Sequence, residues 1–159
     1  MQTQASQYDA VMNAPLGKLG ICIENDKLVK LEYLGSDVKP KAASDPLSKE
    51  VFSQLNKYFS DPGFVFDLPL KSYGTDHQQR VWRALRKIST GKTASYGQIA
   101  DKLGSGARAV GNACRHNPIS IIVPCHRVIA AHGVGGYGGA TNGVILKRKL
   151  WLLEHEGAL

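Results

Sequence analysis

Two helix-start signals constrain the second half of the chain more than any other feature. Each is a Thr or Ser followed three residues later by Gln, a capping box in which both side chains satisfy backbone groups at a helix N-terminus. The two are Thr75 with Gln78 and Ser95 with Gln98. Gly91 and Gly104 are suited to end the helices that follow, because glycine adopts a left-handed backbone without steric cost. The pattern predicts helices over 75–91 and 95–103, a third over 106–114 that Ser105 caps, and a last one over 142–155.

The first half shows the two-residue period of β-strands. Apolar residues alternate over 16–34, and Asn25-Asp26 has the chemistry of a hairpin turn. Pro46 suits the first turn of a helix, which Asp61-Pro62-Gly63 ends. A second alternating run over 64–70 predicts another strand. This half therefore reads as a small sheet with a helix on it.

Together the patterns predict an α+β fold, with a small N-terminal antiparallel sheet and a helix, followed by a mostly helical C-terminal domain. The boundary falls in 71–75, which gives a structural domain over 1–74 and a second domain over 75–159. Apolar residues make up 43% of the 159 residues and charged residues 21%, a globular composition. No run approaches the ~20 apolar residues of a membrane span, and the first residues do not resemble a secretory signal. We therefore expect a cytoplasmic protein.

The charge is divided unevenly along the chain. Residues 1–70 hold seven Lys/Arg and nine Asp/Glu, whereas residues 71–159 hold thirteen Lys/Arg and four Asp/Glu. A strongly basic half is typical of a surface that binds a polyanion. A basic face kept for solubility would look the same, and charge alone does not separate the two.

The helices predicted over 95–103 and 106–114 have the layout of a helix-turn-helix. The second would be the recognition helix, with Arg108 in its first turn. Its other residues are mostly small, including Ala107, Ala109 and Gly111. Small side chains allow a helix to approach a groove closely but cannot discriminate base edges by hydrogen bonds. The pattern indicates DNA binding without sequence preference.

The three cysteines do not form a disulfide or zinc pattern. Cys22, Cys114 and Cys125 are widely spaced, and there is no CxxC pair. Cys22 reads as a small residue of a strand. Cys125 is followed by His126 and Arg127, which could help to form a thiolate nucleophile. If the apolar run before them continues as a strand, His126 reaches the sulfur only through a kink or a bridging water. A buried, unreactive cysteine is the alternative.

The surroundings of Cys125 resemble a known family, the O6-alkylguanine-DNA alkyltransferases, also called methylated-DNA–protein-cysteine methyltransferases. The resemblance rests on Pro124–Val128 and on the preceding 117–123. It extends over 75–157 through segments in the same order: Ser95-Tyr96, 108–113, 135–139 and 152–157. The first half resembles the family in layout only. The family resemblance implies that the protein directly reverses DNA alkylation. It also implies a protein of bacterial or archaeal type that associates with the nucleoid when bound to DNA.

The resemblance also implies the roles of the catalytic residues. Cys125 would take the alkyl group from O6-methylguanine, or from O4-methylthymine, and keep it, so each molecule acts once. His126 would take the thiol proton through a water, and Glu156 would orient His126. Tyr96 would donate a hydrogen bond to the leaving guanine, and Asn117 would hold the turn that places Cys125. No cofactor and no metal are implied.

For DNA, the resemblance implies binding in the minor groove with the damaged base flipped out of the stack. Arg108 would fill the space left by the base; a phosphate contact is the alternative for this residue. Ala109, Gly111, Arg115 and Tyr96 would also face DNA. The implied partner is double-stranded DNA carrying alkylated bases, bound by a monomer without sequence preference, and cooperative binding is left open. The residues implied for the guanine pocket are Cys114, Val128, Tyr137, Gly138 and Ser120.

Some positions depart from the family pattern. Ser120 stands where some relatives have Pro, and Gly138 stands where some have Ser. The segment 130–136 is one residue shorter than in some relatives. These differences leave open which alkyl groups the pocket accepts. Residues 1–70 hold a single Cys and no His, so an N-terminal zinc site is not expected. Three other classes of protein would show different features. A lesion-binding relative would lack Cys125, a transcription regulator would carry base-reading side chains and a dimer interface, and a Cys-His hydrolase would turn over without DNA.

Overall fold

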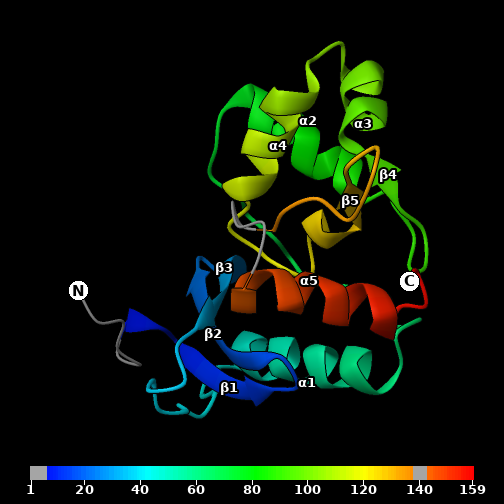
Figure 1. The fold of residues 1–159 in the computed structure, drawn as a ribbon. Coiled ribbons are helices and arrows are strands. Elements are labelled where there is room, and N and C mark those ends of the chain that lie inside the picture. The colour runs from blue at the N-terminus through cyan, green and yellow to red at the C-terminus, as the bar shows by residue number, and fades with distance from the viewer. Residues whose placement is uncertain (1–6, 138–142) are drawn as a thin grey trace. The chain divides into compact units, whose positions relative to one another are not determined.

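The structure is a computed structural model that describes residues 7–137 and 143–159 (Figure 1). The chain forms two compact units. One holds the residues up to Tyr73 together with Pro118–Ser120, and the other holds Gly74–Asn117 and Ile121–Leu159. In the described residues, no helix is long and apolar enough to cross a membrane.

The first unit is a three-stranded antiparallel sheet with one helix. The strands β1 (Ala10–Ala14), β2 (Gly17–Glu24) and β3 (Lys27–Leu34) lie in the order β1-β2-β3. The predicted hairpin is confirmed, since Asn25 and Asp26 join β2 and β3 with φ angles of 50° and 58°, as a type I′ turn requires. β1 is not predicted from the sequence, because Ala10, Val11 and Met12 are apolar in succession and do not alternate.

The helix α1 (Pro46–Ser60) packs on this sheet and completes its core (Figure 1). It starts where predicted, with Pro46 in the first turn and the Asp45 side chain accepting from the Ser48 backbone. Its buried face interlocks with the sheet's apolar face, and both contribute fully buried side chains: Leu19, Ile21, Leu28, Leu31, Val51, Leu55 and Tyr58.

The predicted strand over 64–70 is wrong. Only Leu70 forms a bridge, with Leu28, and the rest has no regular structure. The cause is visible at Asp67, whose backbone N–H and C=O both bond to the Gln54 amide at 2.9 Å. A side chain of α1 thus takes the place of a neighbouring strand, and Pro69 has no N–H to donate to one.

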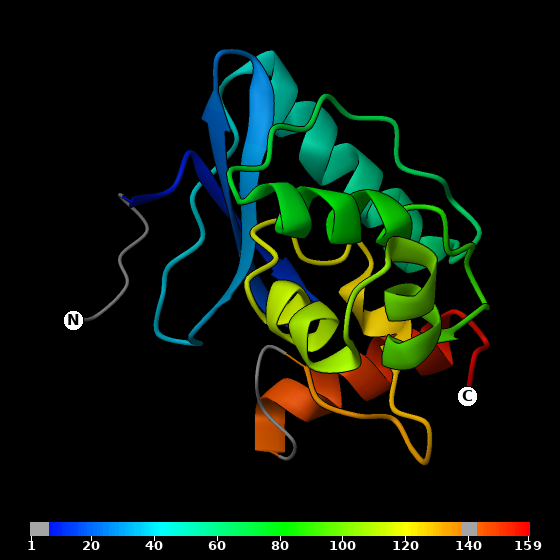
Figure 2. The same ribbon diagram turned by 90° about the horizontal axis from the view of Figure 1, so that it is seen from above.

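The second unit is mostly helical, as predicted, and its helices are grouped together in Figure 2. They are α2 (Asp76–Leu85), α3 (Tyr96–Leu103), α4 (Ala107–Arg115) and α5 (Gly143–His155). Both capping boxes are present, and Gly104 ends α3 with a φ of 62°. Two short strands, β4 (Ala94–Ser95) and β5 (Val128–Ile129), pair in parallel.

Two expected helix boundaries differ, and a third lies outside the described residues. α2 ends at Leu85, not at Gly91, and turns follow it. Gly106, not Ser105, is the N-cap of α4, because the Ser105 hydroxyl bonds to Nε2 of His77 at 2.8 Å. For α5, the described part begins at Gly143, and Asn142 lies outside the described residues. The α3–turn–α4 pair is held by close packing; its use as a DNA-reading helix-turn-helix stays a prediction.

The strand expected to lead into Cys125 is also wrong. Residues 121–123 form turns, and Ile121 has a φ of 72°, a left-handed conformation that is unusual for a β-branched residue. The 3-10 helix η2 (Cys125–Arg127) follows. Cys125 and His126 therefore lie on a tight helical turn, and their side chains do not alternate across a sheet.

Candidate active site around Cys125

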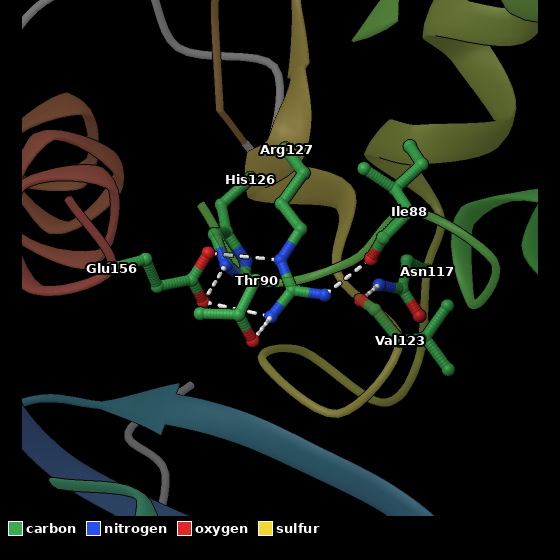
Figure 3. Close-up of polar contacts among 7 residues, drawn as sticks. All are labelled: Ile88, Thr90, Asn117, Val123, His126, Arg127 and Glu156. Carbon is green, nitrogen blue, oxygen red and sulfur yellow. Dashed lines mark hydrogen bonds and ion pairs between the residues drawn. The ribbon is translucent and has the colours of Figure 1, made fainter. Parts of the chain in front are cut away.

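Cys125 begins η2 and is held by a short network of backbone bonds. Its N–H donates to the Val123 carbonyl at 2.8 Å, and the same carbonyl accepts from Nδ2 of Asn117 at 2.8 Å. Asn117 lies just beyond the end of α4, so its side chain ties that helix to the turn before the cysteine (Figure 3). The cysteine is only 6% exposed.

The environment of the Cys125 thiol has opposing effects on its acidity. Burial is the largest effect and raises the pKa, because a thiolate is poorly solvated in the interior. A hydrogen bond with Asn117, the positive charge of Lys149 and a hydrogen bond with Tyr137 lower it. Each of these three groups favours the thiolate. The net pKa is above that of a free cysteine, so the thiol needs a base.

His126 is fully buried and held by Glu156. Its Nε2 lies 2.8 Å from Oε2 of Glu156, and Figure 3 shows the carboxylate facing both His126 and Arg127. Because a carboxylate only accepts hydrogen bonds, Nε2 carries the proton, and Nδ1 has a free lone pair. Among the described residues, Nδ1 is buried and has no hydrogen-bond partner.

Burial lowers the pKa of His126, and the hydrogen bond and charge of Glu156 oppose this effect. The imidazole is therefore neutral at rest. A neutral ring with an unbonded Nδ1, on the same tight turn as a buried thiol, can act as a general base through a bridging water, and a neighbouring carboxylate such as Glu156 can stabilise the imidazolium that forms.

Arg127 was expected to stabilise the Cys125 thiolate, but its guanidinium binds Glu156, Ile88 and Thr90. It donates to both oxygens of Glu156, from Nε at 2.9 Å and from Nη2 at 3.0 Å. The remaining bonds go to the Ile88 carbonyl at 2.5 Å and to the Thr90 hydroxyl at 3.1 Å. A bidentate arginine fixes the plane of a carboxylate. Arg127 thus holds Glu156 in the orientation that it needs to bind His126 (Figure 3).

Lys149 is a site residue that the sequence analysis missed. It lies in α5, is fully buried, and donates from Nζ to the carbonyls of Val128 at 2.6 Å and Gly136 at 2.9 Å. Burial lowers its pKa to about 8, which still leaves it mostly charged at neutral pH. The signal was its spacing, since Lys149 stands three and four residues before Leu152 and Leu153, the other buried residues of that helix. The spacing of Leu146, Leu150 and Leu153 predicts one buried helix face, but only Leu153 is fully buried and the other two are half-buried.

Tyr96 opens α3, and its ring lies beneath the Lys149 ammonium, 5.9 Å from Nζ to the ring centroid. Its hydroxyl donates to the Gly136 carbonyl at 3.4 Å. Burial raises the pKa of Tyr96 to about 12, with smaller contributions from Cys114 and Cys125. The phenol therefore stays protonated and can act as a hydrogen-bond donor.

The other predicted pocket residues are placed as follows. Cys114 is buried at the end of α4, and burial raises its pKa to about 12. Val128 and Tyr137 are buried. Ser120 belongs to the first unit, where its N–H donates to the Leu31 carbonyl at 3.0 Å. Gly138 lies outside the described residues.

The predicted DNA-contacting residues lie on α4. Arg108, Ala109 and Arg115 are exposed, and Gly111 is half-buried. A Cβ added at Gly111 would lie 3.8 Å from the Tyr96 ring, an ordinary van der Waals distance, so α4 passes beside Tyr96 at this position and an alanine would fit there. In the described residues, no group of His, Cys, Asp and Glu is arranged to hold a metal ion.

Replacing Lys149 with Met should slow alkylation of Cys125 by about tenfold, because the positive charge that favours the thiolate is lost and about one pKa unit corresponds to about 1.4 kcal/mol. The Cys125 pKa rises, so the pH–rate profile should move to higher pH. The measurement is the rate of reaction with O6-benzylguanine against pH, with the melting temperature followed in parallel. An unchanged profile with a lower melting temperature would assign Lys149 to stability alone.

A buried cysteine beside a His–Glu pair is the arrangement expected of a sulfur nucleophile, as in a transferase or a hydrolase. The comparisons with known proteins distinguish the two. Residues 76–158 match the family model described as 6-O-methylguanine DNA methyltransferase, DNA binding domain. The chain belongs to the methylated-DNA–protein-cysteine methyltransferase family.

Individual relatives agree over most of the chain. The methylated-DNA–protein-cysteine methyltransferase of Mycobacterium tuberculosis is 45% identical over 152 residues, which cover 91% of this chain and 89% of that protein. The protein of the same name from Shigella flexneri is 47% identical over 137 residues, which cover 84% and 76%. The crystal structure of Mycobacterium tuberculosis OGT in complex with DNA is similar with a TM-score of 0.77 at 44% identity, covering 93% of this chain and 91% of that one. The α+β fold class and the family resemblance are thus confirmed.

Proposed function

We propose that this protein repairs DNA by moving the alkyl group of an O6-alkylated guanine onto Cys125, once per molecule. The observation that carries the proposal is the pair formed by Cys125 and His126 on one tight turn. Nε2 of His126 is bound to Glu156, and Nδ1 is left as a buried acceptor. The family supplies the substrate class.

The proposed alkyl transfer is a single displacement at the alkyl carbon by Cys125. The thiol proton moves to Nδ1 of His126 through a bridging water, and Glu156 stabilises the imidazolium. The Cys125 thiolate attacks the alkyl carbon, an S–C bond forms, and the C–O bond breaks with its electron pair going to O6 of guanine. Tyr96, which remains protonated, donates a hydrogen bond to a ring nitrogen of the leaving guanine. The product is a thioether, which is a poor leaving group.

The proposed partner is double-stranded DNA carrying an alkylated base, bound by a monomer in the cytoplasm. The exposed face of α4, with Arg108, Ala109 and Arg115, would enter the minor groove. Its small residues permit close approach, and its basic residues offset the phosphate charge. In this proposal residues 75–159 bind DNA and transfer the alkyl group, and residues 1–74 are structural. The residues proposed for the guanine pocket are Cys114, Val128, Tyr137, Gly138 and Ser120. The relative solved with DNA supports this partner.

One alkyl group should be transferred per protein molecule, with no recovery of activity. The reason is the stability of a thioether at Cys125. The measurement is the amount of O6-methylguanine lost from duplex DNA present in excess over the protein. Loss that stops at one equivalent supports the proposal, whereas continued loss would indicate a hydrolase with turnover.

Replacing Glu156 with Gln should slow the transfer by about a hundredfold, the scale of a lost general base. The neutral amide neither fixes the His126 tautomer nor stabilises its imidazolium. The His126 pKa should fall further, because Glu156 is what raises it. Thiolate formation then requires a more alkaline solution, and the pH–rate profile should move to higher pH.

Glu154→Gln is the matched control for Glu156→Gln, because Glu154 is an exposed carboxylate in the last turn of α5, two residues before Glu156. It should leave both rate and profile unchanged. If Glu156→Gln reacts at the wild-type rate with the wild-type profile, Glu156 only stabilises the end of the helix, and His126 works without it.

A further inference from the structure

A groove outside the proposed active site runs between α2 and α3. It has a volume of about 400 Å³. Its floor is apolar and is made by Ala84, Ile88, Ala94, Ile99 and Leu103. None of the lining residues comes from α4, which carries Arg108, or from η2, which carries Cys125. Apart from the Ile88 backbone carbonyl, which accepts a hydrogen bond from Arg127, these lining residues have no role in the alkyl transfer proposed above.

Four cationic side chains surround this floor: Arg80 and Arg83 on α2, Lys87 in the turn that follows α2, and Lys102 on α3. All four are exposed. Among the described residues none of them takes part in an ion pair; the two ion pairs found there are both made by Glu156. The groove thus combines an apolar floor with a concentrated, unneutralised positive rim.

Arg80 is also held in position. Its Nη2 donates to the Leu103 carbonyl at 2.7 Å, which joins α2 to the C-terminal end of α3 across the groove. A guanidinium has five N–H donors in a fixed fork, and this bond uses only one of its nitrogens. The rest of the fork can bind a carboxylate with little further loss of side-chain freedom.

We propose that this groove binds an acidic peptide segment of a partner protein, with carboxylates on the cationic rim and an apolar side chain on the floor between α2 and α3. The charge of the rim selects an anionic partner. A peptide fits better than a nucleic acid strand, because single-stranded nucleic acid sites stack bases on aromatic side chains and no aromatic residue lines this groove. Four of the five floor residues are half-buried, so an apolar side chain of the peptide can still contact them.

The test is fluorescence anisotropy with a labelled peptide in which aspartates flank a central Leu-Phe pair. The variant Arg83→Glu/Lys87→Glu reverses two rim charges and leaves the Arg80–Leu103 bond intact. The matched control is Arg86→Glu/Lys92→Glu, which reverses two exposed charges of the same unit outside the groove. We expect the groove variant to bind at least about tenfold more weakly, a change of about 1.4 kcal/mol, and the control variant to bind like wild type.

Two further probes separate a built site from diffuse attraction. A peptide with Gly-Gly in place of Leu-Phe should bind more weakly than the original, and oligothymidylate should not displace the original peptide. Equal binding of the two peptides, equal weakening by both double variants, or displacement by oligothymidylate would each overturn the proposal. Reaction of the groove variant with O6-benzylguanine should match wild type, which keeps this test independent of the proposed repair function.

Discussion

Cys125→Ala should abolish alkyl transfer and leave binding to duplex DNA intact. Cys125 is proposed as the atom that receives the alkyl group, so no other contact of the site can replace it. The substitution removes one sulfur atom from a buried position, which costs little packing. The measurement is transfer of radioactive methyl from methylated DNA to protein, alongside the affinity for the same DNA.

Cys22→Ala is the control, because Cys22 lies in β2 of the first unit. It should transfer methyl at the wild-type rate. Residual transfer by Cys125→Ala would contradict the assignment and would point to Cys114, the other buried cysteine. We do not expect this, since burial raises the Cys114 pKa to about 12 and disfavours a thiolate there.

The second large effect should come from Arg108. If its side chain fills the space left by a flipped base, it offsets an unstacking cost of a few kcal/mol. Arg108→Ala should then slow repair of duplex DNA by about one to two orders of magnitude, at roughly 1.4 kcal/mol per tenfold change. Its reaction with free O6-benzylguanine should stay at the wild-type rate. The measurement is the single-turnover rate on both substrates.

Arg108→Lys separates stacking from charge. Lys keeps the charge but loses the planar head that stacks between bases, so this variant should remain slow on duplexes. A phosphate contact predicts the opposite, with Lys substituting well and the defect shrinking at low salt. Arg115→Ala, on the same helix, offers the comparison for a phosphate contact. Slow reaction of Arg108→Ala with the free base would mean that Arg108 shapes the active site, and both interpretations would be wrong.

Elements with strong local signals were predictable from the sequence. The capping boxes at Thr75 and Ser95, the Asn25-Asp26 turn and the Gly104 stop each depend on a few neighbouring residues. The failures involve partners far away in sequence. The run over 64–70 alternates like a strand, but Gln54 takes its backbone bonds. Ser105 has the chemistry of an N-cap, but His77 takes its hydroxyl.

The residues of the candidate site also fall into two groups, those that the local sequence indicates and those that only tertiary contacts bring together. Cys125 and His126 stand out as neighbours, and the family pattern pointed to Glu156. Neither approach indicated that Arg127 binds Glu156, since residues 29 positions apart come together only when α5 returns to η2. Lys149 shares the helical spacing of Leu152 and Leu153, but its two partners, the carbonyls of Val128 and Gly136, are brought together only by the tertiary fold. Tertiary contacts therefore determine both the Arg127–Glu156 ion pair and the burial of Lys149.

Mass spectrometry of the protein after incubation with a duplex containing O6-methylguanine tests the central claim most directly. The account predicts a gain of one methyl group, located by peptide mapping on the peptide that contains Cys125, and no gain with an unmodified duplex. A methyl group on the peptide that contains Cys114 would contradict the assignment of the acceptor. Loss of O6-methylguanine from the DNA with no mass gain on the protein would contradict the transfer mechanism itself.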